Sequence, residues 1–184
     1  RKIDLIVLHC SATRADRCYT EYDLITDHLP GGGGSGAGYH YYIRKDGSIK
    51  SLRPVDKSGA HARGYNAHSI GVCNEGGLDT NGHSCDTRTT FQKHSLRVMV
   101  ILLLKEYPGS RVVGHRDLSP DLNHNGEIEP EEWIKECPCF DAATILQEPP
   151  PPNLLTYNTL NNANRWPFFL LLGVGVPRRG EVVG

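Results

Sequence analysis

The stretch IDLIVLH, residues 3–9, is an apolar run rich in β-forming side chains, and it ends on a histidine. Such a run predicts a strand that is buried on both faces. Two further runs, SIGVCN at 69–74 and RVVG at 111–114, predict two more strands, and the second of these is followed directly by His115. A single histidine at a strand end is most often structural. Because neighbouring strands can place their ends side by side, however, His9 and His115 become candidates for one site.

The other patterned segments predict two helices and a hairpin. Residues 20–28 begin with a threonine and an acidic first turn, and residues 89–106 begin with a Thr-x-x-Gln capping-box pattern. Residues 39–44 and 48–52 flank an Asp-Gly pair that is typical of a hairpin turn. Strands and helices are therefore mixed. We expect an α/β fold in which helices flank a central mixed β-sheet within a single domain.

The composition limits the classes of protein and partner. The chain has 184 residues, a net charge of −1 and a hydrophobic content of 38%, which are ordinary values for a globular domain with its own core. Without a basic excess, nucleic acid is not an expected partner. No apolar run approaches the ~20 residues that a transmembrane helix needs. We expect a monomer, and since the chain begins at Arg1, its first residues do not report a cellular location.

The composition changes toward the C-terminus. Four prolines at 149–152 predict extended chain, and an apolar run, WPFFLLLGVGV, follows at 166–176. We therefore divide the chain into a domain at 1–148 and a tail at 149–184. The tail could be a strand packed on the domain, an interaction segment or non-native sequence. A glycine-rich run at 31–38 predicts a flexible loop, which either borders a site or simply links two elements.

The segment KECPCF, residues 135–140, contains two cysteines around a proline. It could contribute to a disulfide framework, a redox pair or a metal site. The chain has six cysteines, an even number that permits disulfides, although a domain of this length does not need them. Two histidines and one cysteine with a fourth position left to water form a known catalytic zinc pattern. Zinc in such a site acidifies its bound water and polarises a carbonyl group.

Five blocks of the sequence, in order across residues 3–145, resemble the zinc-dependent N-acetylmuramoyl-L-alanine amidases, the family of phage T7-type lysozymes and peptidoglycan recognition proteins. The blocks are LIVLHCSAT (5–13), GYHYYIRKDGSI (38–49), GAHARGYNAHSIGVCNEGGLD (59–79), GHRD (114–117) and KECPCFD (135–141). The resemblance implies a single α/β domain of that family and does not cover the tail. It also implies that His9, His115 and Cys137 bind zinc, whereas Cys139 falls on a variable position.

The resemblance assigns catalytic positions to Tyr39 and Lys135. Tyr39 is suited to form a hydrogen bond with the zinc-bound water or with the developing tetrahedral centre, and Lys135 is suited to stabilise the oxyanion with its positive charge. His61 and Asn66 fall where the family shapes its substrate groove, so they are candidate substrate contacts. The alternative for these two is a hydrogen bond that stabilises the loop.

The reaction implied by the resemblance is hydrolysis of the amide between the lactyl group of N-acetylmuramic acid and L-alanine, in peptidoglycan or a soluble muropeptide. The alternative is a non-catalytic peptidoglycan receptor. Receptors of this kind generally lack the cysteine ligand, so the presence of Cys137 favours the enzyme. The sequence leaves the location open: the protein acts on the bacterial cell wall after export, or after cytoplasmic storage until lysis.

A second metal motif lies in DLNHNGEIEPEE, residues 121–132, which matches the D-x-[DN]-x-[DN]-G-x5-E calcium loop. No entering helix precedes it, while EPEEWIKE, residues 129–136, predicts an exiting helix. We therefore expect a half-EF-hand-like insertion at 117–132 that binds Ca²⁺ and fixes the connection between the two zinc-ligand segments. The alternatives are a metal-free turn, or a calcium-dependent binding module in which this loop is the main feature. The expected ligands are Asp121, Asn123, Asn125, the carbonyl of Glu127, and Glu132.

Overall fold

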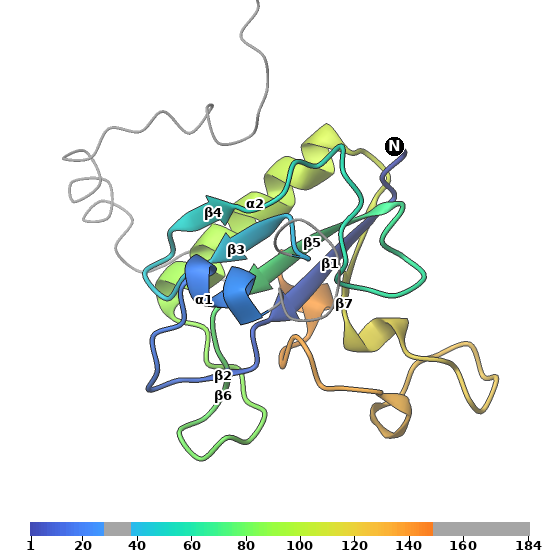
Figure 1. Cartoon of the computed structure of the whole chain (residues 1–184). Coiled ribbons are helices and arrows are strands. Elements are labelled where there is room, and N and C mark those ends of the chain that lie inside the picture. The colour runs from blue at the N-terminus through green and yellow to red at the C-terminus, as the bar shows by residue number, and fades with distance from the viewer. Residues whose placement is uncertain (28–37, 149–184) are drawn as a thin grey trace, which may run out of the picture. The chain divides into compact units, whose positions relative to one another are not determined.

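The computed structural model describes residues 1–27 and 38–148, and their centre is a five-stranded mixed sheet (Figure 1). Its strand order is β4-β3-β5-β1-β7. The strands are β1 (Leu5–Cys10), β3 (Tyr41–Ile43), β4 (Ile49–Ser51), β5 (Ser69–Asn74) and β7 (Arg111–Gly114). Three of the predicted strands and the predicted hairpin are thereby confirmed.

β5, β1 and β7 are parallel neighbours in the sheet. β1 lies between β5 and β7, and all of its residues are buried, as expected for an apolar run at the middle of a parallel sheet. Leu8 pairs with Gly114, so the ends of β1 and β7 meet at the same edge of the sheet. This register brings His9, near the end of β1, close to His115, which follows β7.

The hairpin forms the other side of the sheet. β3 pairs with β5 in parallel and with β4 in antiparallel fashion, and this pairing makes the sheet mixed. Tyr42 pairs with Cys73, which in turn pairs with His9. Because directly paired residues point to the same face of a sheet, these three side chains share one face.

Two α-helices cover opposite faces of the sheet, α1 (Glu21–Asp27) in front and α2 (Thr90–Glu106) behind in the view of Figure 1. Leu24 of α1 packs on Tyr42 and Cys73. The capping box that opens α2 is present, because the side chain of Thr89 accepts a hydrogen bond from the backbone N–H of Gln92, and the Gln92 side chain accepts one in return. Both predicted helices are therefore confirmed.

The segment after β7 differs from the prediction. Residues 129–136 do not form an exiting α-helix. Only one 3-10 turn, η2 (Pro130–Glu132), is present, after an earlier 3-10 turn, η1 (Arg116–Leu118). The carboxylate of Glu132 accepts hydrogen bonds from the backbone N–H groups of Leu122 and Asn123, so it turns back onto the loop. Side chains that bond local backbone groups in this way compete with helix formation.

A small second sheet, which the sequence did not predict, is formed by the pairing of β2 (Thr13–Arg14) with β6 (Gly77–Leu78). The loop predicted at 31–38 lies outside the described residues except for its last glycine, and the tail at 149–184 lies outside them entirely. Among the helices of the described part of the chain, none combines the length and the apolar character that crossing a membrane requires.

Candidate metal centre and active site

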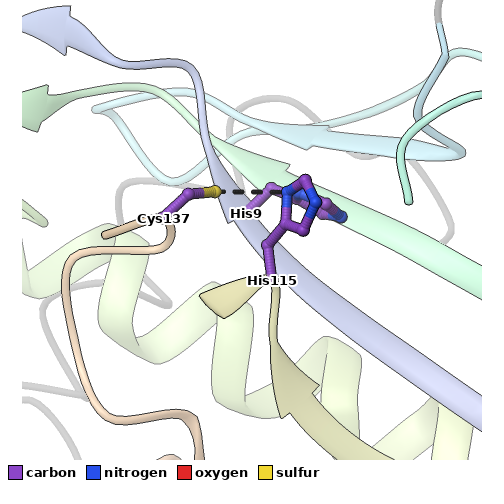
Figure 2. Close-up of side chains that lie close together, drawn as sticks. All are labelled: His9, His115 and Cys137. Atoms are coloured by element: carbon purple, nitrogen blue, oxygen red, sulfur yellow. Dashed lines mark hydrogen bonds between the residues drawn. The ribbon is translucent and has the colours of Figure 1, made fainter. Parts of the chain in front are cut away.

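Three side chains that are far apart in the sequence meet at one end of the sheet. His9, His115 and Cys137 each offer one ligand atom, and these atoms all lie within 4.8 Å of one another. Figure 2 shows the Cys137 thiol directed at the imidazole of His9, with His115 beside it. The sulfur lies 3.7 Å from Nδ1 of His9, and the two imidazole rings are 4.6 Å apart between centroids.

Backbone contacts hold the three ligand segments together. The N–H of His115 donates to the carbonyl of Leu8 at 3.1 Å, which extends the β1–β7 pairing up to the ligand. The N–H of Arg116 donates to the carbonyl of Cys137 at 2.8 Å. A Cβ at Gly114 would lie 2.7 Å from Cδ of Pro138, so only glycine lets the cysteine segment lie against the end of β7.

The two histidines are held neutral. Burial is the main cause that lowers the pKa of His9 well below its usual value, and it lowers the pKa of His115 to about 4. The positive charge of Lys135 acts in the same direction on both. The backbone N–H of Cys10 donates to Sγ of Cys137 at 3.4 Å. Neutral imidazoles and a thiolate are the protonation states that a metal ion requires of its ligands.

The donor set fits zinc. Two imidazole nitrogens and one thiolate sulfur are zinc ligands of the borderline-soft type, and three protein ligands leave a position for water or substrate. Within residues 1–27 and 38–148, this is the one group of three His, Cys, Asp or Glu side chains with that spacing. The chemistry of the residues present is therefore compatible with the zinc ion that the sequence predicts.

Tyr39 and Lys135 both lie beside this cluster. The ring of Tyr39 meets that of His9 edge to face, with 5.0 Å between centroids. Burial raises the pKa of its hydroxyl far above the usual value, so the group keeps its proton and remains a donor. Lys135 is exposed, and among the described residues it makes no ion pair. Its charge is therefore free to act on a bound substrate.

A cavity of about 210 Å³ opens beside the cluster, with His115 and Lys135 in its wall. Its remaining lining residues are Ala62, Arg63, Tyr65, Leu118, Ser119 and Ile134. The wall contains two side chains with full positive charges and no acidic one. Such a wall favours an anionic or strongly polar substrate group.

His61 and Asn66 make contacts inside the protein. The imidazole of His61 is 8% exposed, and its Nδ1 lies 3.0 Å from Nε2 of His9. Oδ1 of Asn66 accepts hydrogen bonds from the backbone N–H groups of His61 and Ala62, each at 2.9 Å. These contacts favour the loop-stabilising alternative for Asn66 and a position behind the metal ligand for His61. Contact of either residue with substrate stays a prediction.

All six cysteines are free thiols. The sequence did not predict that Cys139 would face Cys10, with 3.7 Å between their sulfurs. The pKa of the Cys10 thiol is raised to about 12, chiefly by its hydrogen bond with Cys137. Cys139 does not belong to the three-residue ligand group.

The loop at 121–132 forms the turn that its motif predicts, with Gly126 at positive φ, and its polar side chains bond the loop backbone. Oδ2 of Asp121 accepts from the N–H of Gly126, and Oδ1 of Asn123 accepts from the N–H of Asn125. Oδ1 of Asp121 is buried without a hydrogen-bond partner among the described residues. Glu132, the last expected ligand, instead accepts backbone N–H groups with both oxygens. Calcium binding by this loop stays a prediction.

Comparison with known proteins gives a consistent result. The family described as N-acetylmuramoyl-L-alanine amidase matches residues 1–132. The endolysin of Escherichia phage T7 is 34% identical over 138 residues, which cover 75% of this chain and 82% of that protein. An uncharacterized protein of Haemophilus influenzae is 43% identical over 109 residues, which cover 59% of this chain and 94% of that protein.

Solved structures show the same fold. The N-acetylmuramoyl-L-alanine amidase LysC from Clostridium intestinale superposes with a TM-score of 0.56 at 28% identity, covering 87% of this chain and 86% of that one. Drosophila PGRP-LB superposes with a TM-score of 0.56 at 21% identity, and the match covers 74% of this chain and 75% of that one. The length of the matched segment and the agreement between sequence and fold lead to one conclusion: this chain belongs to the N-acetylmuramoyl-L-alanine amidase family.

Proposed function

We propose that this chain hydrolyses the amide between the lactyl group of N-acetylmuramic acid and L-alanine, and that it does so with a zinc ion held by His9, His115 and Cys137. Peptidoglycan amidase activity is the activity of its family. The observation that supports the metal is the convergence of the three side chains, whose ligand atoms lie within 4.8 Å of one another. A zinc ion held there would acidify water and polarise a carbonyl group.

The protein's own residues supply the remaining parts of the reaction. Water adds to the lactyl carbonyl carbon, the carbonyl oxygen gains negative charge, and the L-alanine nitrogen leaves with a proton. Tyr39 keeps its proton and donates a hydrogen bond at the charged oxygen or at the attacking water. Lys135 lies in the cavity wall beside His115, where its ammonium stabilises the developing oxyanion.

The complete ligand set argues against the receptor alternative. A receptor needs the cavity and its polar contacts. It does not need a cysteine next to two neutral imidazoles, nor a lysine without an ion-pair partner beside them. The likeness to peptidoglycan recognition proteins at 21% identity supports the shared fold alone. Because the phage relatives are endolysins, we further propose that the bacterial cell wall is where this enzyme acts.

The test is metal content together with cleavage of a muramoyl-L-alanine peptide, before and after chelation and after return of zinc. The expected result is one zinc per chain, with cleavage lost on chelation and restored by zinc. Stoichiometric zinc without cleavage of any muropeptide would favour the receptor. Absence of zinc from a folded protein would contradict the ligand assignment.

We propose separately that the loop at 121–132 binds Ca²⁺. Two features support this: Oδ1 of Asp121 is buried without a hydrogen-bond partner among the described residues, and the chain turns at Gly126. To bind the ion, the Glu132 carboxylate would have to give up the hydrogen bonds that it accepts from backbone N–H groups such as that of Leu122. Calorimetric titration of calcium into chelator-stripped protein should give one site, and Asp121→Asn should weaken it by about tenfold or more. If no heat of binding is measured at millimolar calcium, the proposal is contradicted.

A further inference from the structure

His9 uses its two ring nitrogens in opposite directions. Nδ1 lies toward the metal site, 3.7 Å from the sulfur of Cys137, and Nε2 lies 3.0 Å from Nδ1 of His61. On its far side, Nε2 of His61 lies 3.3 Å from Oγ of Ser69. His9 and Ser69 are fully buried, and His61 is 8% exposed. A line of hydrogen-bonding groups therefore runs from the metal site into the protein.

The backbone around His61 is shaped to hold this ring. A Cβ at Gly71 would lie 2.6 Å from two of its atoms, and a Cβ at Gly59 would lie 2.6 Å from its Cδ2. Both distances are shorter than van der Waals contact allows, so the two glycines leave the space that the imidazole fills. In addition, Oδ1 of Asn66 accepts a hydrogen bond from the backbone N–H of His61. The position of the ring is therefore fixed from several directions.

The protons in this line can be arranged in one way that suits a metal. A neutral imidazole carries one N–H and one lone pair. If Nδ1 of His9 gives its lone pair to the metal, its proton must be on Nε2, from which it donates to Nδ1 of His61. The proton of His61 is then on Nε2 and donates to Oγ of Ser69. Each group has a partner, and no donor faces a donor.

We infer that His61 is a positioning residue for the metal centre: it accepts the Nε2 proton of His9 and so fixes that ligand in the tautomer whose Nδ1 binds zinc. This inference rests on the proposed zinc site. Partners of this type orient a ligand and raise its basicity, and their removal weakens metal binding by about 10- to 100-fold. It gives His61 a different role from the substrate contact that the sequence predicts.

The experiment compares zinc affinity with substrate binding in matched variants. Zinc dissociation constants are measured by competition with a chromogenic chelator for the native protein, His61→Leu, His61→Asn and Ser69→Ala. The leucine variant should bind zinc about 10- to 100-fold more weakly. The asparagine variant retains an acceptor near the position of Nδ1 and should recover most of that loss, while Ser69→Ala should change affinity by about threefold or less. At saturating zinc, KM should be unchanged in all of them.

Two outcomes would overturn the inference. One is native zinc affinity in His61→Leu, and the other is a raised KM at saturating zinc with unchanged zinc affinity, which would make His61 a substrate contact. A native protein that binds no zinc would instead overturn the proposed function. Nitrogen-15 NMR of the zinc-loaded native protein gives a test without substitution. The proton of His9 should be on Nε2, and a proton found on Nδ1 would contradict the assignment.

Discussion

The two candidate metal sites are built in opposite ways. The zinc ligands come from distant segments, with His9 and Cys137 separated by 128 positions, and parallel strand pairing brings them together. The calcium motif lies within one short loop, where Glu132 accepts hydrogen bonds from its own neighbours. The zinc ligands are held in place by the core of the domain without an ion. In the calcium loop, Glu132 must give up hydrogen bonds to backbone N–H groups before it can contact an ion. Residues that match a motif over a short stretch therefore carry less information about geometry than residues placed by a sheet.

The largest expected effect concerns the two cysteines of residues 135–140. Cys137→Ser should reduce zinc affinity by more than about 100-fold and abolish cleavage, because it removes a ligand and not merely a supporting partner. Cys139→Ser is the matched control, two positions away and outside the ligand group, and it should keep both properties. Zinc titration and a muropeptide cleavage assay measure the difference. Equal behaviour of the two variants would show that the thiol of Cys137 is not the ligand.

The next effect separates charge in the cavity from metal binding. Lys135→Ala should lower kcat by about 100- to 1000-fold through loss of oxyanion stabilisation, with zinc content unchanged. Arg63→Ala removes the other cation of the same wall and should change kcat by less than about tenfold. Steady-state kinetics at saturating zinc give the comparison. A larger loss of kcat in the arginine variant would reverse the assignment.

Acid should destabilise the two regions in different pH ranges. In the metal-free protein, burial lowers the pKa of His61 to about 3 and that of His40 to about 4, below the usual 6.5. The unfolded chain therefore binds more protons, and the free energy of unfolding should fall as the pH drops from about 6.5 toward 4 and below.

The loop should respond at lower pH. Hydrogen bonds from backbone N–H groups, first that of Glu129, lower the pKa of Glu132 below the usual 4.5, so its contribution is retained until the pH falls through that range. Chemical denaturation at several pH values measures the global loss. The fluorescence of Trp133, in a Trp166→Phe background, reports the loop. Loss of the loop signal near pH 6 would contradict the separation.

The smallest effect concerns two glycines. Gly126 has φ +89° with open space around it, so Gly126→Ala should cost about 1 kcal/mol of stability through backbone strain, a fall in Tm of roughly 2–4 °C. Zinc affinity should not change. A Cβ at Gly114 meets Pro138, so Gly114→Ala should displace the cysteine segment and weaken zinc binding. Thermal unfolding and zinc titration of both variants test this contrast.

Much of the fold follows from local sequence patterns. Apolar runs specify β1, β5 and β7, and the capping box specifies the start of α2, because burial and backbone capping are short-range rules. β2 and β6 could not be predicted, since each has two residues and depends on its partner. The prediction of an exiting helix was wrong because the Glu132 side chain forms hydrogen bonds with the loop backbone. Helix propensity does not account for such a tertiary contact.

The site was predicted to a similar extent. The resemblance selected His9, His115 and Cys137, and the structure brings these three together. It did not reveal that His61 lies behind His9, nor that Cys10 faces Cys139, since both contacts depend on side-chain direction across the sheet. The glycine at position 71 was the signal for the contact between His61 and His9, because its missing Cβ leaves the space that the His61 ring fills.

The wide separation of the ligands along the chain has a consequence for folding kinetics. The complete site exists only after β1 has paired with β7 and the segment around Cys137 has closed onto that pair, and such non-local pairings form slowly. Zinc that binds the finished site therefore acts mainly after the folding barrier has been crossed. We expect zinc to slow unfolding much more than it accelerates refolding, which stopped-flow chevrons with and without the ion would measure. Bound zinc would thus lengthen the lifetime of the folded enzyme by slowing its unfolding.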